Sequence, residues 1–367
     1  MSTTSKSPTL RDLEPYLADY RVSSDWQGAW QVVSTILLFI VLWAAMYLCL
    51  SVSYFLTLLL VLPTSLLLVR LFILQHDCGH RSLFRSKRTN DIVGSLLGIV
   101  TLTPYHCWRR KHAIHHANSG DLDRRGRGQG EIRVMTVDEY QAADWKARLK
   151  YRLYRNPFVL FCIGPAFEFM ISQRFPSIVP KNWKRERWSI HLTNLAALAF
   201  IAALCWSLGT KEFLIIQVPV MVIAAQIGVW LFYVQHQYEE AFYERADDWD
   251  YVQAAMAGRS HNRLPRLLQW FTASIGLHHI HHLDSRIPNY RLQQCYDEQP
   301  RLRAAKELTL LESLQCVHFK LWDEEQEKMV GFGNAGRAPE VPRPSITGTV
   351  QSRETETPES AKEPLST

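Results

Sequence analysis

The chain has 367 residues, a length that allows one or two domains. Hydrophobic residues make up 47% of it and charged residues 21%, values typical of a soluble protein. However, the apolar residues gather in four blocks with the charges between them, which argues against a soluble protein with a single core. The net charge of +6 is local, because residues 81–187 hold 21 Lys and Arg against nine Asp and Glu.

The N-terminal segment and the cysteines indicate a chain exposed to the cytosol. Residues 1–29 carry charges and no apolar run, so we expect a cytosolic segment without a cleavable signal peptide. The seven cysteines are scattered, and no C-x-x-C pair occurs. This usage argues against a disulfide framework and favours reduced thiols.

The four apolar blocks are near 20 residues long, the length that crosses a hydrocarbon core. Short turns at 51–53 and 209–212 join them in pairs, so we predict two transmembrane helical hairpins. The alternative is that these blocks are helices buried in a soluble core. Arg70 lies close enough to the end of its block to reach the headgroups. The predicted spans cover residues 30–50, 54–74, 191–208 and 213–234.

The distribution of basic residues orients these hairpins. The two turns carry one Lys between them, so the positive-inside rule places both termini and the segments 75–190 and 235–330 in the cytosol. Within these segments, the apolar stretches 92–103 and 158–171 are too short or too interrupted to span. We expect helices at the membrane surface there, or alternatively helices packed inside the cytosolic part. A domain of residues 30–330 would then be followed by a disordered tail, 331–367, rich in Pro, Glu, Ser and Thr.

Three short windows concentrate the histidines, at residues 76–80, 112–116 and 278–282. The second and third windows place histidines at i, i+3 and i+4, which share one face of a helix. His76 and His80, at i and i+4, do the same. Neutral imidazole is a ligand for Fe, Zn, Cu and Ni. One such window occurs often by chance, but three in one chain predict a metal site.

The predicted topology brings these windows to one side of the membrane. The first window begins two residues after the second span, and His236 follows the fourth span at the same distance. Nine histidines suit two metal ions with four or five nitrogens each. Glu-x-x-His, the di-iron pattern of soluble bundles, does not occur. We therefore predict an iron pair, with zinc as an open alternative. The predicted ligands are His76, His80, His112, His115, His116, His236, His278, His281 and His282.

Other polar residues near the windows are candidates for supporting roles. Carboxylates here can orient ligand imidazoles as hydrogen-bond acceptors, or can simply be solvated. The remaining histidines either support the site or pack. Tryptophans such as Trp108 are expected to be interfacial anchors or core residues rather than catalytic groups. The candidates for support are Asp77, His106, Glu239, Glu240, His279 and Asp284.

A basic run accompanies the second window. These side chains can hold a lipid phosphate or an acidic electron carrier, although the positive-inside rule alone also explains them. No known nucleic-acid-binding fold and no motif of aromatic residues that stack on bases accompanies them, so we expect no nucleic-acid partner. The basic candidates are Arg109, Arg110, Lys111, Arg124, Arg125 and Arg127.

From about residue 70 to 300 the chain resembles the membrane fatty acid desaturases, in particular their bacterial acyl-lipid branch. The resemblance rests on three histidine boxes, HDCGH (76–80), HAIHH (112–116) and HHIHH (278–282). The runs TLTPYHCWRRKHAIHHANSGDLDRRG (101–126) and LPRLLQWFTASIGLHHIHHLDSRIPNY (264–290) match as well. His236 within FYVQHQYEE matches the additional histidine before the third box.

The resemblance implies an all-α integral membrane protein with four transmembrane helices and a cytosolic helical cap that carries a histidine-rich di-iron site. It also implies O2-dependent insertion of a cis double bond into the acyl chain of a membrane lipid, with O2 reduced to water. Relatives with similar flanks indicate the delta-12 position. No His-Pro-Gly-Gly run of a fused cytochrome b5 occurs, so the electrons would come from a separate donor, a ferredoxin or a cytochrome b5. The implied location is the bacterial inner membrane.

Three other functions use similar residues. An acyl or alkane hydroxylase, or a carotenoid oxygenase, would share the irons and the helices and differ in the product. A membrane zinc hydrolase would need fewer histidines. A metal transporter would need polar ligands near the membrane midplane, where the spans offer only Gln217 and Gln226. No motif indicates whether the acyl chain is carried on a phospholipid, on CoA or on a carrier protein.

Overall fold

A computed structural model describes residues 10–126 and 132–334, and most of them are helical. The α-helices are α1 Leu10–Leu17, α2 Asp25–Cys49, α3 Tyr54–His80, α4 Lys87–Val100, α5 Tyr105–Asn118, α6 Val137–Ala142, α7 Trp145–Tyr154, α8 Gly164–Ala166, α9 Lys184–Leu208, α10 Thr210–His236, α11 Tyr251–Met256, α12 Arg266–Phe271, α13 His278–Leu283, α14 Asn289–Glu298 and α15 Leu310–Gln315. Two π-helical turns, Val159–Ile163 and Phe167–Ile171, flank α8.

Five short strands complete the described part. β1 Met135–Thr136 pairs in parallel with β4 Leu321–Asp323, and β5 Lys328–Val330 pairs antiparallel with β4. β2 His261–Arg263 pairs in parallel with β3 Glu307–Thr309. These small sheets join segments that are far apart in the sequence. The fold is predominantly helical, as predicted.

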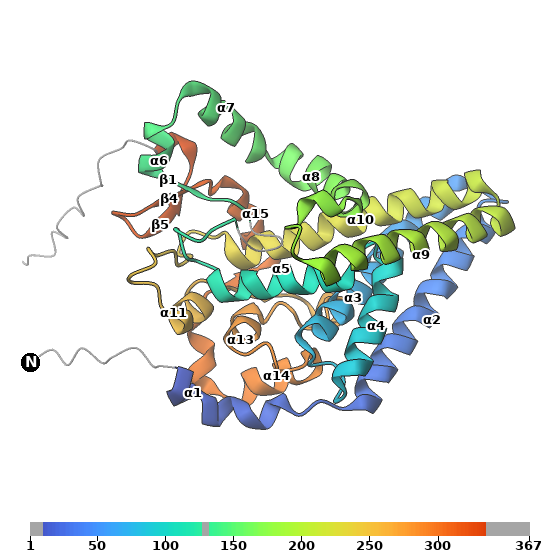
Figure 1. The fold of residues 1–367 in the computed structure, drawn as a ribbon, viewed down its shortest axis with the longest axis horizontal. Helices are drawn as coiled ribbons and strands as arrows, with labels where there is room; N and C mark the ends of the chain where they lie inside the picture. The colour runs from blue at the N-terminus through green and yellow to red at the C-terminus, as the bar shows by residue number, and fades with distance from the viewer. Residues whose placement is uncertain (1–9, 127–131, 335–367) are drawn as a thin grey trace, which may run out of the picture. The chain divides into compact units, whose positions relative to one another are not determined.

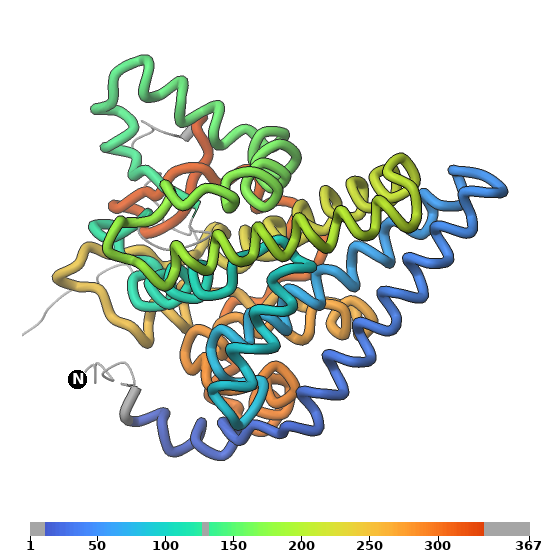
Figure 2. The backbone as a smooth tube through the Cα atoms, turned by 45° about the vertical axis from the view of Figure 1, so that its right-hand side comes forward, coloured from blue at the N-terminus to red at the C-terminus, as the bar shows by residue number. Residues whose placement is uncertain are grey.

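Among the described residues, four helices, α2, α3, α9 and α10, are long and apolar enough to cross a membrane. They form the two predicted hairpins, and both hairpin turns lie at the same end of the helices (Figures 1 and 2). α3 and α10 continue past their apolar blocks to end at His80 and His236. The helices therefore carry histidines beyond the apolar region on a rigid backbone.

Arg70 differs from its sequence-based expectation. Its side chain is buried at the side of α3 rather than extended toward headgroups. The guanidinium donates to Thr35 Oγ1 over 3.1 Å and to the carbonyl of Trp270, and it lies 4.3 Å from the centre of the Trp270 ring. A buried cation that is hydrogen-bonded and stacked in this way ties α3 to α2 and α12.

The segments outside the hairpins pack around the histidine windows. Leu13, Leu17 and Tyr20 of the N-terminal segment share a core with Ile280 and Leu283 of α13. Both predicted surface segments are helical and expose apolar side chains, among them Leu96 on α4 and Phe167 beside α8. Their location at a membrane surface remains a prediction.

The end of the described part lies a few residues inside the predicted tail. Residues 332–334 form a short 3-10 helix, and the Phe332 ring lies 5.3 Å from that of Tyr140. The rest of the predicted tail, residues 335–367, lies outside the described residues.

Candidate metal centre

Four helices bring the three histidine windows and His236 together. α3 supplies His76 and His80 from its last turn, and α5 supplies the second window. α10 ends at His236. The third window forms the short helix α13. Because i, i+3 and i+4 positions share a helix face, each helix turns its histidines toward the others.

The first group contains five histidines from α3, α5 and α13. One ring nitrogen from each lies within 4.8 Å of one from every other member. His112 and His116 approach to 3.1 Å between their Nε2 atoms. Two nitrogens bound to one ion at about 2.1 Å and at right angles lie about 3 Å apart. This spacing fits a shared ion, and the group comprises His76, His80, His112, His116 and His281.

The second group contains His115, His236 and His282. The Nε2 atom of His236 lies 3.1 Å from that of His115 and 3.3 Å from that of His282. The predicted ligand His278 lies outside this group, but its ring centre is 4.7 Å from that of His236 and 4.6 Å from that of His282. The groups adjoin, since His116 and His282 stack at 4.0 Å.

Histidines of both groups are held in the neutral form, which can bind a metal cation. Burial, reinforced by neighbouring imidazoles, holds the pKa of His112 and His281 well below the ordinary value. Burial has the same effect on the pKa of His115 and His282, where the nearby Arg259 guanidinium adds to it. Neutral imidazole is the form that binds metal. Several buried ring nitrogens have no hydrogen-bond partner in the described part, including Nε2 of His80, His278 and His281. Metal ions would satisfy these orphaned acceptors.

Two of the predicted ligand rings have hydrogen-bond partners at Nδ1. Nδ1 of His236 lies 2.8 Å from the carbonyl of Phe232, and Nδ1 of His76 lies 3.2 Å from Oδ1 of Asp77. In each case donation from Nδ1 leaves Nε2 as the acceptor, which is the arrangement of metal-bound histidines. Asp77 is itself held, since Oδ2 accepts from the backbone and side-chain nitrogens of Asn289, both over 2.8 Å.

Most of the other predicted supporting residues lie away from the histidine groups. Glu239 and Glu240 are exposed, and Glu240 pairs with Lys306. Asp284 is buried but pairs with Arg21 and Arg286. It therefore anchors the N-terminal segment to the end of α13. In the described part, only Asp77 of the four predicted carboxylates contacts a histidine of the two groups.

The two remaining histidines have different surroundings. The ring of His279 lies 5.9 Å from that of His261 and 6.1 Å from that of Tyr296. His106 lies beside Arg185, with 3.4 Å between Nε2 and the guanidinium, and it lines one cavity together with His80 and His112. Neither belongs to the two groups.

The basic candidates lie in different surroundings. Arg109 and Arg110 line a polar cavity of about 380 Å³ that reaches His80 and His112. Arg124 and Arg125 instead pair with Asp121 and Glu139. Lys111 is half-buried on α5, and Arg127 lies outside the described residues.

Comparison with known proteins decides the family. The family model described as fatty acid desaturase matches residues 51–310. A fatty acid desaturase of Bacillus subtilis is 46% identical over 302 residues, which cover 82% of this chain and 85% of the relative. The chain belongs to the fatty acid desaturase family.

More distant relatives have more specific names. An sn-1 oleoyl-lipid 12-desaturase of Synechocystis sp. is 27% identical over 240 residues, 63% of this chain and 64% of the relative. An sn-1 acyl-lipid omega-3 desaturase (ferredoxin) of the same genus is 29% identical over 233 residues, 61% of this chain and 62% of the relative. Family membership makes the chain an oxidoreductase, and together with the four apolar helices it indicates a membrane protein.

Three cavities, each sharing wall residues with the next, lie beside the histidines of this family member and between its long helices. The first, about 130 Å³, is lined by His76, His112 and His278. It shares Phe72, Phe169 and Gly228 with a second cavity of about 40 Å³. The second shares Met221 with a third cavity of about 550 Å³.

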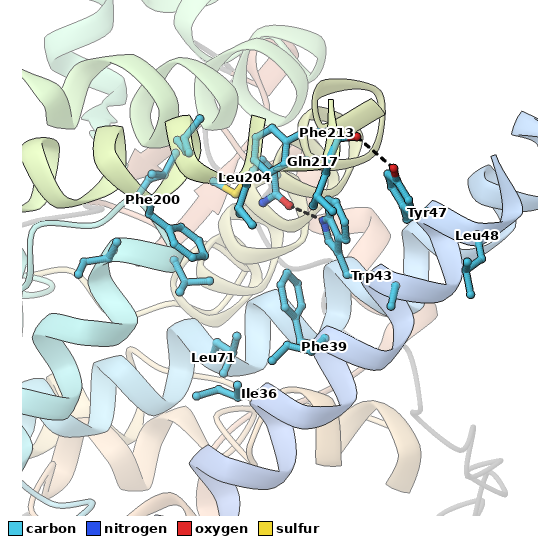
Figure 3. Close-up of a pocket in the computed structure, with 18 residues that line it drawn as sticks. Ile36, Phe39, Trp43, Tyr47, Leu48, Leu71, Phe200, Leu204, Phe213 and Gln217 are labelled. Atoms are coloured by element: carbon cyan, nitrogen blue, oxygen red, sulfur yellow. Dashed lines mark hydrogen bonds between the residues drawn. The ribbon is translucent and has the colours of Figure 1, made fainter. Parts of the chain in front are cut away.

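The third cavity lies between the long helices (Figure 3). Its wall is almost wholly apolar, with residues such as Phe39, Leu71 and Phe213. A polar pair interrupts it where the Trp43 indole donates to Gln217 Oε1 over 3.0 Å. A cavity of this composition accommodates a hydrocarbon chain.

Two residues beside the histidines escaped the sequence analysis, and a third, Trp108, was expected only as an interfacial anchor or core residue. Trp108 stacks on His112, with 4.5 Å between ring centres and 18° between planes. It therefore contacts the candidate centre directly. Buried Arg259 lies near the second group, and Asn289 fixes Asp77. No short-range pattern links Arg259 or Asn289 to the windows, because both act through long-range contacts.

Replacing Asp77 by Ala is expected to weaken iron binding about 10- to 100-fold, since His76 loses the acceptor that orients its ring. Competition with a calibrated iron chelator on purified protein measures the change. Glu240→Ala removes an exposed carboxylate from the same predicted set and should leave the affinity unchanged. Equal iron affinity in the Asp77 variant and the wild type would contradict the orienting role.

Proposed function

We propose that this family member inserts a cis double bond into the acyl chain of a membrane lipid in an O2-dependent reaction at two iron ions. The two histidine groups hold the ions, with His278 completing the second group. The proposal rests on two features of the structure that occur at the same place. Clustered neutral imidazoles line the first of three adjoining cavities, and His76 and His112 belong both to the cluster and to the wall of that cavity.

The protein residues have three tasks in this reaction. The imidazoles hold the ions in a fixed geometry. Phe72, Trp108 and Phe169 form the apolar part of the wall of the first cavity, which also includes Glu168 and Gln235, and they keep water from the reacting methylenes. The long cavity positions one part of the acyl chain beside the histidines. When bound, the iron pair supplies, with O2, the oxidising power needed to remove hydrogen from an unactivated C–H bond.

The electrons come from a separate donor, and ferredoxin is the favoured one. A relative named as a ferredoxin-dependent desaturase supports this choice. The polar cavity beside Arg109 and Arg110 gives a route to His80 and His112 for an acidic carrier. We place this face in the cytosol and the helices in the inner membrane of a bacterium, because the basic residues gather on the histidine side.

Expression in a bacterial host without polyunsaturated lipids tests the proposal. We expect new double bonds in the lipid acyl chains, at the delta-12 position, by mass spectrometry. This position follows the relative named as an oleoyl-lipid 12-desaturase. Product formation should require O2, and the purified protein should contain about two irons per chain.

Two results would overturn the proposal. New hydroxyl groups in place of double bonds would indicate a hydroxylase. Zinc as the sole metal, together with lipid hydrolysis that proceeds without O2, would indicate a hydrolase. Host cells with the empty vector provide the baseline for both measurements.

A further inference from the structure

A groove on α4 combines cationic and apolar walls. It has a volume of about 600 Å³ and is lined on α4 by Lys87, Arg88, Leu96 and Ile99, and across from them by Arg185 of α9. Residues 87 to 99 span about 18 Å of helix. The cationic residues lie at the start of α4, and the apolar residues follow toward its end. The groove, called the α4 groove below, therefore changes from charged to apolar along its length.

The positive charge of the α4 groove is not neutralised from within. Asp91 also lines it, but this carboxylate already pairs with three guanidinium groups, those of Arg81, Arg109 and Arg185. Within the described residues, no ion pair involves Lys87 or Arg88, and both side chains are exposed. An anionic group at this end of the groove would find two free cations and a third nearby.

The apolar end of the α4 groove adjoins the large cavity between the long helices. Ile99 lines both the groove and this cavity. The next two cavities adjoin in the same way, sharing Met221 and then Phe72 and Gly228, and the last of them is lined by His76. A molecule with an anionic head in the groove and a hydrocarbon chain in the cavities would thus reach the candidate metal centre.

We propose that the α4 groove binds the phosphodiester of an anionic glycerophospholipid, whose acyl chain enters the large cavity past Ile99. This inference rests on the proposed function and specifies its substrate as an acyl chain esterified in an intact membrane phospholipid.

The wall of the groove favours a lipid over other anions. Ile92 and Leu96 on this wall are 50% and 59% exposed, and exposed apolar side chains next to cations suit the boundary between headgroups and acyl chains. An acidic protein would leave these side chains against a polar surface. The polar cavity beside Arg109 and Arg110, which adjoins the groove at Arg185, has no such apolar wall and is better suited to an acidic partner.

Binding of dioleoyl-phosphatidylglycerol to the full chain in detergent, measured by native mass spectrometry, tests the proposal. The test variant combines Lys87→Gln and Arg88→Gln, and it keeps Arg185 because that residue also lines the polar cavity beside Arg109 and Arg110. The matched control combines Lys146→Gln and Lys150→Gln, which removes two exposed charges from α7. We expect the test variant to bind the phospholipid at least about tenfold more weakly, and the control to bind it like the wild type.

Two further probes identify the ligand. Dioleoylglycerol, which lacks the phosphate, should bind the wild type and the test variant alike. Oleoyl-CoA at equal concentration should not displace the phospholipid from the wild type. Displacement by oleoyl-CoA in the wild type but not in the test variant would show that the groove serves CoA esters and overturn the proposal.

Unchanged phospholipid binding in the test variant would also overturn the proposal. If reduction by added ferredoxin were lost in the same variant, the groove would be assigned to the electron donor instead. Because binding is measured without turnover, failure of the inference is distinct from failure of the proposed function, which would appear as a lack of new double bonds.

Discussion

Replacing His281 by Ala is expected to lower double-bond formation to below about 1% of the wild-type rate and to reduce the bound iron to about half. His281 is the member of the first group that α13 supplies, with ring-centre distances of 4.5 Å to His76, 4.7 Å to His80 and 4.8 Å to His116. Its loss removes one ligand nitrogen from an ion and leaves a cavity beside the remaining histidines of the group. Lipid analysis after expression and metal analysis of the pure protein measure the two effects.

The chain offers two matched controls for this prediction. His279→Gln changes a buried histidine of the same window that faces His261 and Tyr296. His318→Ala changes an exposed histidine far along the chain. Both variants should retain full iron content and most of the activity. If His281→Ala kept full activity, or if His279→Gln lost iron to the same extent, the ligand assignment would be wrong.

The sequence predicted the parts of the fold that depend on composition and local spacing. The long apolar blocks predicted the four helices, because the cost of burying charges in a membrane imposes that pattern. The spacing of His112, His115 and His116 predicted a shared face, and the structure turns the three toward the other windows. The same periodicity explains His279. As the residue next to His278 on a helix, it points about 100° away, to His261.

The sequence was a poorer guide to supporting residues, because nearness in sequence is not nearness in space. Glu240 follows His236 closely but lies on the surface, since α10 ends at His236 and the chain turns away. Asp284 follows His282 but faces Arg21. Conversely, Asn289 contacts Asp77 across 212 positions of the chain. Contacts of this kind depend on how the helices pack, which no local pattern specifies.

The division of the histidines into two groups also required the structure. α5 contributes to both, with His112 and His116 in the first group and His115 in the second. α13 does the same with His281 and His282. Adjacent residues of one helix point about 100° apart, so one helix can serve two ions. The spacing predicted convergence, but the packing of α5 against α3 and α10 decided which ring joins which group.

Replacing Gly228 by Leu is expected to reduce double-bond formation at least about tenfold while the iron content stays unchanged. Gly228 lies on α10 and lines both small cavities together with Phe72 and Phe169, and the first of these cavities is also lined by His76 and His112. A Cβ atom added here meets no atom within 4 Å. A leucine side chain would therefore enter the open path without displacing the backbone, and would block an acyl chain on its way to His76.

The variant Gly228→Ala is the matched control, because its single methyl group lies in the same open space. Alanine is favoured over glycine inside a helix by about 1 kcal/mol, so both variants should fold at least as well as the wild type. Thermal unfolding and metal analysis verify this, and lipid analysis measures the product. A Leu variant with the wild-type rate would show that the acyl chain reaches the histidines by another route. A Leu variant that lost iron would show instead that Gly228 supports the metal centre, because blockage of the path leaves the imidazoles in place.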